Sequence, residues 1–231
     1  MRERPIIFSA PMVRAILDGR KTQTRRVVKR LKMHADHGEP QWETARNDAS
    51  YAPIPCLKVT YDGCGIAGME TTHRHWCPYG VPGDRLWVRE TWCKTRNRFL
   101  YRASCADDKP SANTDDWDAP TDDRWRPSIL MPRKASRLTL EITGVRVERV
   151  QAISEEDAIA EGVQTHAQHY GVPEEKLYGT TPWYRYDGRA CSAMSAKESY
   201  MTLWESINGK GSWAENPWVW VVEFKRVGGV G

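Results

Sequence analysis

The stretch Gly19-Arg20-Lys21-Thr22-Gln23-Thr24-Arg25-Arg26 is the most informative part of this sequence. It begins a run, residues 20–32, that contains seven Lys or Arg side chains and no Asp or Glu. Because such a run has no counter-charge of its own, it needs an anionic partner or water around it. A solvated basic strand edge is the simpler interpretation. Lys21 and Thr24 also place an amine and a hydroxyl close together, which is typical of an activated nucleophile.

The residues around this stretch predict a strand, a helix and a second strand. Residues 4–8 form an apolar strand pattern, and Ser9 followed by Pro11 is typical of a helix start. Apolar residues from 12 to 17 recur at helical spacing, and Gly19 ends the helix. Residues 22–28 then form the second strand. Lys21 is therefore predicted at the turn from helix to strand, where a side chain can reach substrate.

Further along the chain, strands dominate. Strands are predicted at 84–90, at 99–101 as part of the same sheet, at 136–150 with a bend at Gly144, and at 218–224. Ser154 and Ser195 each begin a capping box, which predicts helices ending at Gly162 and at Asn208-Gly209. The pattern predicts one α+β, barrel-like domain over 1–231, in which short helices interrupt the strands.

Three long insertions interrupt this domain, at about 29–82, 103–133 and 165–194. The first has poor periodicity and many turn residues, so we expect little regular structure there. Between 107 and 123 the second contains seven Asp and one Lys, a composition that predicts a poorly ordered loop.

Composition and length exclude several classes of protein. The chain has 231 residues, a net charge of +4 and no stretch approaching the ~20 apolar residues of a membrane span. Pro11 and Arg14 interrupt the apolar segment that a signal peptide would need. We therefore expect a cytoplasmic protein that makes no membrane contact, with its six cysteines as free thiols.

A cluster of Cys and His side chains raises the question of a zinc site. Its members are Cys56, Cys64, His73, His75 and Cys77. The first two are eight residues apart, and the last three alternate along the chain, so neither spacing matches the usual zinc motifs. We expect a chance cluster, with no bound metal and no cofactor.

Four pieces of the sequence together resemble the ASCH domain of the PUA-like superfamily, and their order is the order in that family. They are the Gly19-to-Arg26 turn, the Gly83-Asp84-x-Leu86-Trp87-Val88 strand, the 154–162 helix with Glu161-Gly162, and the closing Trp220-Val221-Val222-Glu223-Phe224 strand. They cover about half the chain, the part outside the insertions. The whole is similar to the larger ASCH proteins encoded by bacteriophages and prophages.

The resemblance implies a small β-barrel with a cleft for RNA or a modified nucleoside. Some ASCH members are amidohydrolases that remove an acyl group from the exocyclic amine of a modified cytidine, using a Lys, a Thr and a Glu. The matching residues here are Lys21, Thr24 and Glu161. Other members resemble ribonucleases acting on single-stranded RNA. The basic run would then supply nucleic-acid contacts through Arg20, Arg25, Arg26, Lys29 and Arg30.

Amide hydrolysis needs a nucleophile, a proton acceptor and a proton donor for the leaving amine. Thr24 would attack or orient a water, and Lys21 would accept a proton if nearby arginines lowered its pKa. Glu161 would protonate the leaving nitrogen. Two other interpretations stay open: a non-catalytic RNA-binding or modified-base-reading module, and a phage accessory protein whose insertions bind a host or phage protein.

Overall fold

A five-stranded mixed sheet organises the described chain. The structure is a computed structural model that describes residues 1–28, 41–45, 54–62, 70–105, 124–165, 184–185 and 195–227. The strand order is β1-β6-β9-β12-β2, with bounds Glu3–Ile7, Arg85–Arg89, Thr139–Arg149, Trp218–Val227 and Gln23–Val27. β1 runs parallel to β6, and the other pairs are antiparallel. The α+β class predicted from the sequence is therefore confirmed.

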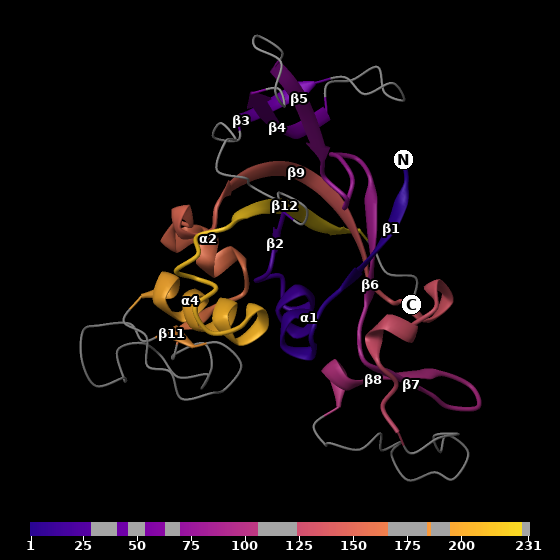
Figure 1. The fold of residues 1–231 in the computed structure, drawn as a ribbon. Coiled ribbons are helices and arrows are strands. Elements are labelled where there is room, and N and C mark those ends of the chain that lie inside the picture. The colour runs from indigo at the N-terminus through magenta and orange to yellow at the C-terminus, as the bar shows by residue number, and fades with distance from the viewer. Residues whose placement is uncertain are drawn as a thin grey trace.

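The sheet is open and strongly curved. In the described residues, β1 and β2 stand at the two ends of the strand order, so these pairings do not close the expected barrel. β9 and β12 arch together over α1 (Figure 1). Their register shifts between Glu223 and Phe224, opposite the predicted bend at Gly144. A Cβ at Gly144 would lie 2.5 Å from a carboxylate oxygen of Glu223, so any larger residue there would require the end of the Glu223 side chain to move.

In the part of the chain that the structure describes, three α-helices pack beside this sheet. Their bounds are α1 Ala10–Leu17, α2 Glu155–Ala160 and α4 Ala196–Asn208. The Ser154 hydroxyl accepts a hydrogen bond from the Asp157 amide and the Ser195 hydroxyl accepts one from the Glu198 amide, which confirms both predicted helix starts. None of the described helices combines the length and apolar character needed to cross a membrane.

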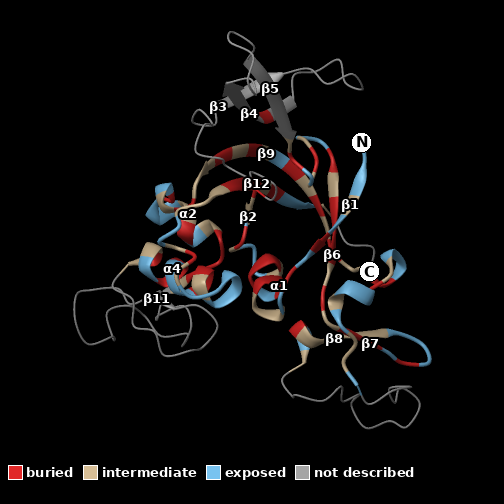
Figure 2. Cartoon of the chain, in the orientation of Figure 1, coloured by how far each residue is buried: buried red, intermediate tan, exposed pale blue. Residues whose placement is uncertain are grey.

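The main apolar core lies between the sheet and the helices. Figure 2 shows buried residues concentrated along the arched strands and on α1. The core includes side chains of β1, β6, β9 and β12 and of α1 and α4, among them Ile6, Val13, Leu86, Leu140, Val221 and Leu203, and the partly buried Val27 of β2 packs against it. Burial of these side chains is the main term that holds the helices on the sheet.

The structure corrects the expectation of little regular structure in residues 29–82. A three-stranded antiparallel sheet lies there, formed by β3 Gln41–Ala45, β4 Ile54–Asp62 and β5 Glu70–Trp76. It projects from the convex side of the arch (Figure 1). These strands pair mainly with one another. In the sequence, the turn residues that separate them concealed the alternation typical of strands.

A second correction concerns residues 99–101, which do not extend the main sheet. β8, Phe99–Tyr101, pairs with β7, Trp92–Lys94, in a separate hairpin. The Thr95 hydroxyl accepts a hydrogen bond from the Arg98 amide and donates one to the Arg98 carbonyl oxygen, each at 2.9 Å. This tight turn directs β8 back onto its neighbour in sequence.

The remaining described elements are short. They are the 3-10 helices Arg102–Ser104, Ser128–Leu130, Arg133–Ala135 and Val150–Ala152, and the strands β10 Gln164–Thr165 and β11 Tyr184–Arg185, which pair with each other. Residues 106–123, 166–183 and 186–194 lie outside the described residues, so the loop prediction for the acidic segment stays a prediction.

Candidate active site

A tight turn after α1 places Lys21 against α2. Gly19 has a φ of 75°, a left-handed conformation that glycine adopts without strain. The amides of Arg20 and Lys21 both donate to the Ala15 carbonyl, and the Thr22 amide donates to Ala160 at the end of α2. The prediction that Lys21 lies at the helix-to-strand turn is confirmed.

Lys21 and Glu161 form a buried ion pair. The Lys21 Nζ lies 2.6 Å from Glu161 Oε2 and also donates to the Glu161 backbone carbonyl at 2.7 Å. The exposed fractions of the two side chains are 0% and 3%. Gly162 permits this approach, because a Cβ there would lie 3.0 Å from the Ala15 Cβ and 3.4 Å from the Lys21 Cβ.

Arg25 joins the same carboxylate from the neighbouring strand. Its Nη1 lies 3.3 Å from Glu161 Oε1, and its Nη2 lies 2.6 Å from both Asp157 Oδ2 and Glu148 Oε1. Arg146 closes the arrangement by contacting three carboxylates, those of Glu148, Asp157 and Glu223. We call this set the ion network; its members are Lys21, Arg25, Arg146, Glu148, Asp157, Glu161 and Glu223.

Burial sets the protonation behaviour of the network. Burial lowers the pKa of Lys21; Glu161 opposes this shift, while Arg26 and Arg25 reinforce it. The predicted effect of neighbouring arginines is therefore present, but burial is the larger cause. Burial alone would raise the pKa of Asp157, but the charge of Arg25 reverses this and holds that pKa below its ordinary value.

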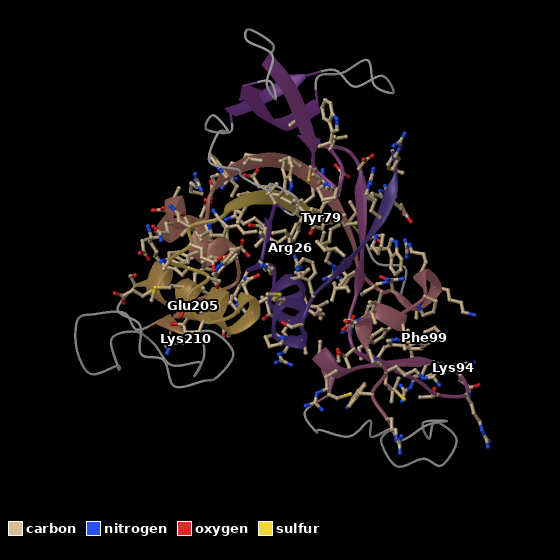
Figure 3. The ribbon with its side chains drawn as sticks, viewed as in Figure 1. Arg26, Tyr79, Lys94, Phe99, Glu205 and Lys210 are labelled. Carbon is tan, nitrogen blue, oxygen red and sulfur yellow. The ribbon has the colours of Figure 1, made fainter. Side chains whose placement is uncertain are left out.

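A pocket of about 190 Å³ opens beside the ion network. Thr24 and Glu161 both line it, together with Tyr79 between β5 and β6 and with residues of α1, β2 and α4: Met12, Arg25, Arg26, Val27, Tyr200, Leu203, Trp204, Ile207 and Asn208. Arg26 and Tyr79 lie close together at the centre of the molecule (Figure 3). The volume is below the ~300–1,000 Å³ typical of drug-sized ligands, so the pocket suits a smaller group.

The structure brings the three predicted catalytic residues to one region in two different ways. Thr24 and Glu161 share the pocket wall. Lys21, whose side chain has no exposed surface, contacts Glu161 from within the protein interior. The Lys21–Glu161 contact is therefore direct, whereas Thr24 is related to Glu161 through the pocket that both residues line.

The structure describes three of the five predicted nucleic-acid residues: Arg25 is buried, and Arg20 and Arg26 are half-buried. Arg25 is 4% exposed and fully ion-paired. Arg20 donates to Asp18 and to the Gly162 carbonyl, and Arg26 donates to the Ile7 carbonyl at 2.6 Å. Lys29 and Arg30 lie outside the described residues. The anionic partner that the basic run requires is, for Arg25, supplied by the chain itself.

Sequence reasoning missed several residues of this site, although some left a signal. Arg146 and Glu148 are two apart on a predicted strand, so they share one face. Asp157 lies four residues before Glu161, on the same side of a helix. Tyr200 and Trp204 are four residues apart on α4, so they share one helix face, and both line the pocket.

The zinc question concerns side chains that are mostly outside the described part of the chain. Cys64 is not described, nor are the side chains of His73 and His75. Burial raises the pKa of Cys77 to about 11, which favours the protonated thiol over the thiolate that zinc binds. Among the described residues, no three His, Cys, Asp or Glu side chains form a group that could hold a metal ion.

Comparison of the chain with protein-family models, with curated proteins and with solved structures found no match.

Proposed function

We propose that this chain is a hydrolase that removes an acyl group from the exocyclic amine of a modified, cytidine-type base, on a PUA-like (ASCH) fold. The observation that carries the proposal is the buried Lys21–Glu161 pair behind a pocket whose wall contains Thr24 and Glu161. The same proposal includes a cytoplasmic location, a phage-type origin and RNA or a nucleoside as the partner.

The three side chains divide the reaction between them. The Thr24 hydroxyl attacks the acyl carbonyl, or orients the water that does, and Lys21 accepts the proton released in that step. Glu161, hydrogen-bonded to Lys21, passes that proton on to the leaving nitrogen as the C–N bond breaks. If Thr24 is the nucleophile, a water then hydrolyses the threonine ester, so that in either case water and amide become carboxylic acid and free amine. The lowered pKa of Lys21 supports its part as the base.

The rest of the pocket supports a planar substrate. Tyr79, Tyr200 and Trp204 line it, and aromatic side chains bind bases by stacking on their faces.

Deacylation of an acylated cytidine nucleoside tests the proposal, with Thr24→Val as the main variant. Valine preserves the shape of threonine and removes only the hydroxyl, so we expect turnover to fall by about 10²–10⁴-fold. Thr24→Ser should restore part of the activity. Lys21→Arg should fail, because a guanidinium stays protonated and cannot act as a base. Cleavage of single-stranded RNA without deacylation would instead identify a ribonuclease.

A second candidate function is a non-catalytic module that binds RNA or reads a modified base. The observation favouring it is that the amine of Lys21 donates twice to Glu161 and has no exposed surface, a geometry that also suits a structural ion pair. Tight binding of the acylated nucleoside by the parent protein, with no turnover at any pH, would establish this function over the hydrolase.

A further inference from the structure

We infer that Arg25 is a positioning residue for the Lys21–Glu161 pair: it shares the Glu161 carboxylate with Lys21 and supplies the counter-charge that lets the lysine release its proton. The consequence for catalysis rests on the proposed function. The charge arrangement itself does not, and it is measurable without any substrate.

The two oxygens of Glu161 are divided between two cations. Oε2 accepts from Lys21 at 2.6 Å, and Oε1 accepts from Arg25 at 3.3 Å. The carboxylate is therefore held at both ends, and its plane at the pocket wall is set by two different elements, the α1–β2 turn and β2 itself.

Arg25 can hold this position because its own place is fixed. Its side chain is fully buried, its Nε and Nη2 both donate to Glu148 on β9, and Nη2 also donates to Asp157 on α2. Its guanidinium lies 5.9 Å from the ring centroid of Tyr200 on α4. Only a planar group with several donors reaches three carboxylates at once, so lysine is a poor replacement.

The sharing of Glu161 matters for proton transfer. A buried carboxylate paired with one ammonium favours the charged lysine and opposes loss of its proton. A second cation on the same carboxylate offsets that attraction. The charged groups that face Lys21 are Glu161, directly after α2, and Arg25 and Arg26 from β2. The centroid of the Phe8 ring lies 5.7 Å from the Lys21 Nζ. Tyr200 of α4 faces Glu161 and Arg25.

Arg146 provides a matched control. Arg25 and Arg146 both contact Glu148 and Asp157, but the third partner of Arg25 is Glu161, whereas the third partner of Arg146 is Glu223. Arg25→Gln and Arg146→Gln thus each remove one arginine from the ion network, and only the first removes a cation from Glu161.

The test is a ¹⁵N NMR titration of the Lys21 Nζ in the full chain, with the signal assigned by its loss in Lys21→Met. In Arg25→Gln we expect Lys21 to titrate about one pH unit higher than in the parent, which is roughly a tenfold drop in neutral amine at a given pH. In Arg146→Gln the titration should stay at the parent value. If Arg25→Gln does not fold, Arg25→Lys takes its place in the test. One ammonium shared among three carboxylates should also raise the pH at which Lys21 titrates.

Equal Lys21 titrations in the parent, the Arg25 variant and the Arg146 variant would overturn the inference. Deacylation kinetics give a second readout: Arg25→Gln should lower kcat/KM about tenfold near neutral pH and move its pH profile to higher pH. A parent protein that deacylates nothing would remove the proposed function, while the NMR titration would still decide the role of Arg25.

Discussion

Two arginine-rich regions of this molecule behave in opposite ways. In the ion network, Arg25 and Arg146 are held by carboxylates from β9, α2 and β12, and Arg25 has no exposed side-chain surface. In contrast, residues 85–105 and 124–137, around the β7–β8 hairpin, contain eleven Lys or Arg and one acidic residue, the buried Glu90. Arg96, Arg124 and Lys134 there are exposed to water.

The comparison shows that a basic run in the sequence does not locate a basic surface. In the described part of the 20–32 run, Lys21 and Arg25 are buried and Arg20 and Arg26 are half-buried. Arg96, Arg124 and Lys134 are exposed, in a region where the positive charges are spread along two segments. Removing charge should therefore alter stability in the first region and long-range electrostatics in the second.

The largest effect is expected from Glu161→Ala. This change leaves Lys21 and Arg25 as buried cations with one carboxylate fewer, which typically costs about 3–5 kcal/mol of unfolding free energy. Urea unfolding measures it. Glu161→Gln, which can still accept the lysine hydrogen bond, should lose less. A loss below about 1 kcal/mol for the alanine variant would show that the pair contributes no more than a surface ion pair.

The next largest effect is expected from Gly162→Ala, with Gly83→Ala as its control. Both glycines have positive φ, 102° and 89°, so alanine strains the backbone at each by about 1–3 kcal/mol. At Gly162 the new Cβ also meets Ala15 at 3.0 Å, whereas at Gly83 nothing lies within 4 Å. Thermal unfolding should show a greater loss of stability for Gly162→Ala than for Gly83→Ala. Equal losses would mean that the contacts of the new Cβ with Ala15 and Lys21 are relieved at no cost.

A smaller effect is expected on RNA binding when exposed cations are removed. If single-stranded RNA binds this chain, Arg96→Gln with Arg124→Gln should reduce the slope of log affinity against log salt by about two, roughly one for each lost phosphate contact. Arg25→Gln should leave that slope unchanged, because its charge is balanced inside the protein. A reduced slope for Arg25→Gln, with an unchanged slope for the Arg96 and Arg124 variant, would instead assign the phosphate contacts to the 20–32 run.

The smallest effect is expected at the surface pair between Arg133 and Glu3. Its atoms are 3.0 Å apart, but both side chains are exposed, so Arg133→Ala should cost about 0–1 kcal/mol. Unfolding at low and at high salt should show that this small difference disappears as salt screens the charges. A loss as large as that of Glu161→Ala would remove the distinction between the two regions.

Local features of the fold were predictable because their causes are local. The helix at 10–17, the strands at 23–27 and 139–149, and the caps at Ser154 and Ser195 follow from apolar spacing and from side chains that bond nearby amides. The β3–β5 sheet and the β7–β8 hairpin were missed. Their pairing partners are chosen by turn geometry and by contacts that no single segment encodes.

The sequence by itself determined that Lys21 lies at a turn beside a hydroxyl and a basic run, and its resemblance to the ASCH family pointed to Glu161. Only the tertiary structure decided what surrounds them. Lys21 and Glu161 are 140 residues apart, and Arg25 reaches Glu148 across 123 residues. Burial and charge pairing over such separations depend on how β2, β9 and α2 pack, so charge alone could not reveal that Arg25 is an interior residue of the site.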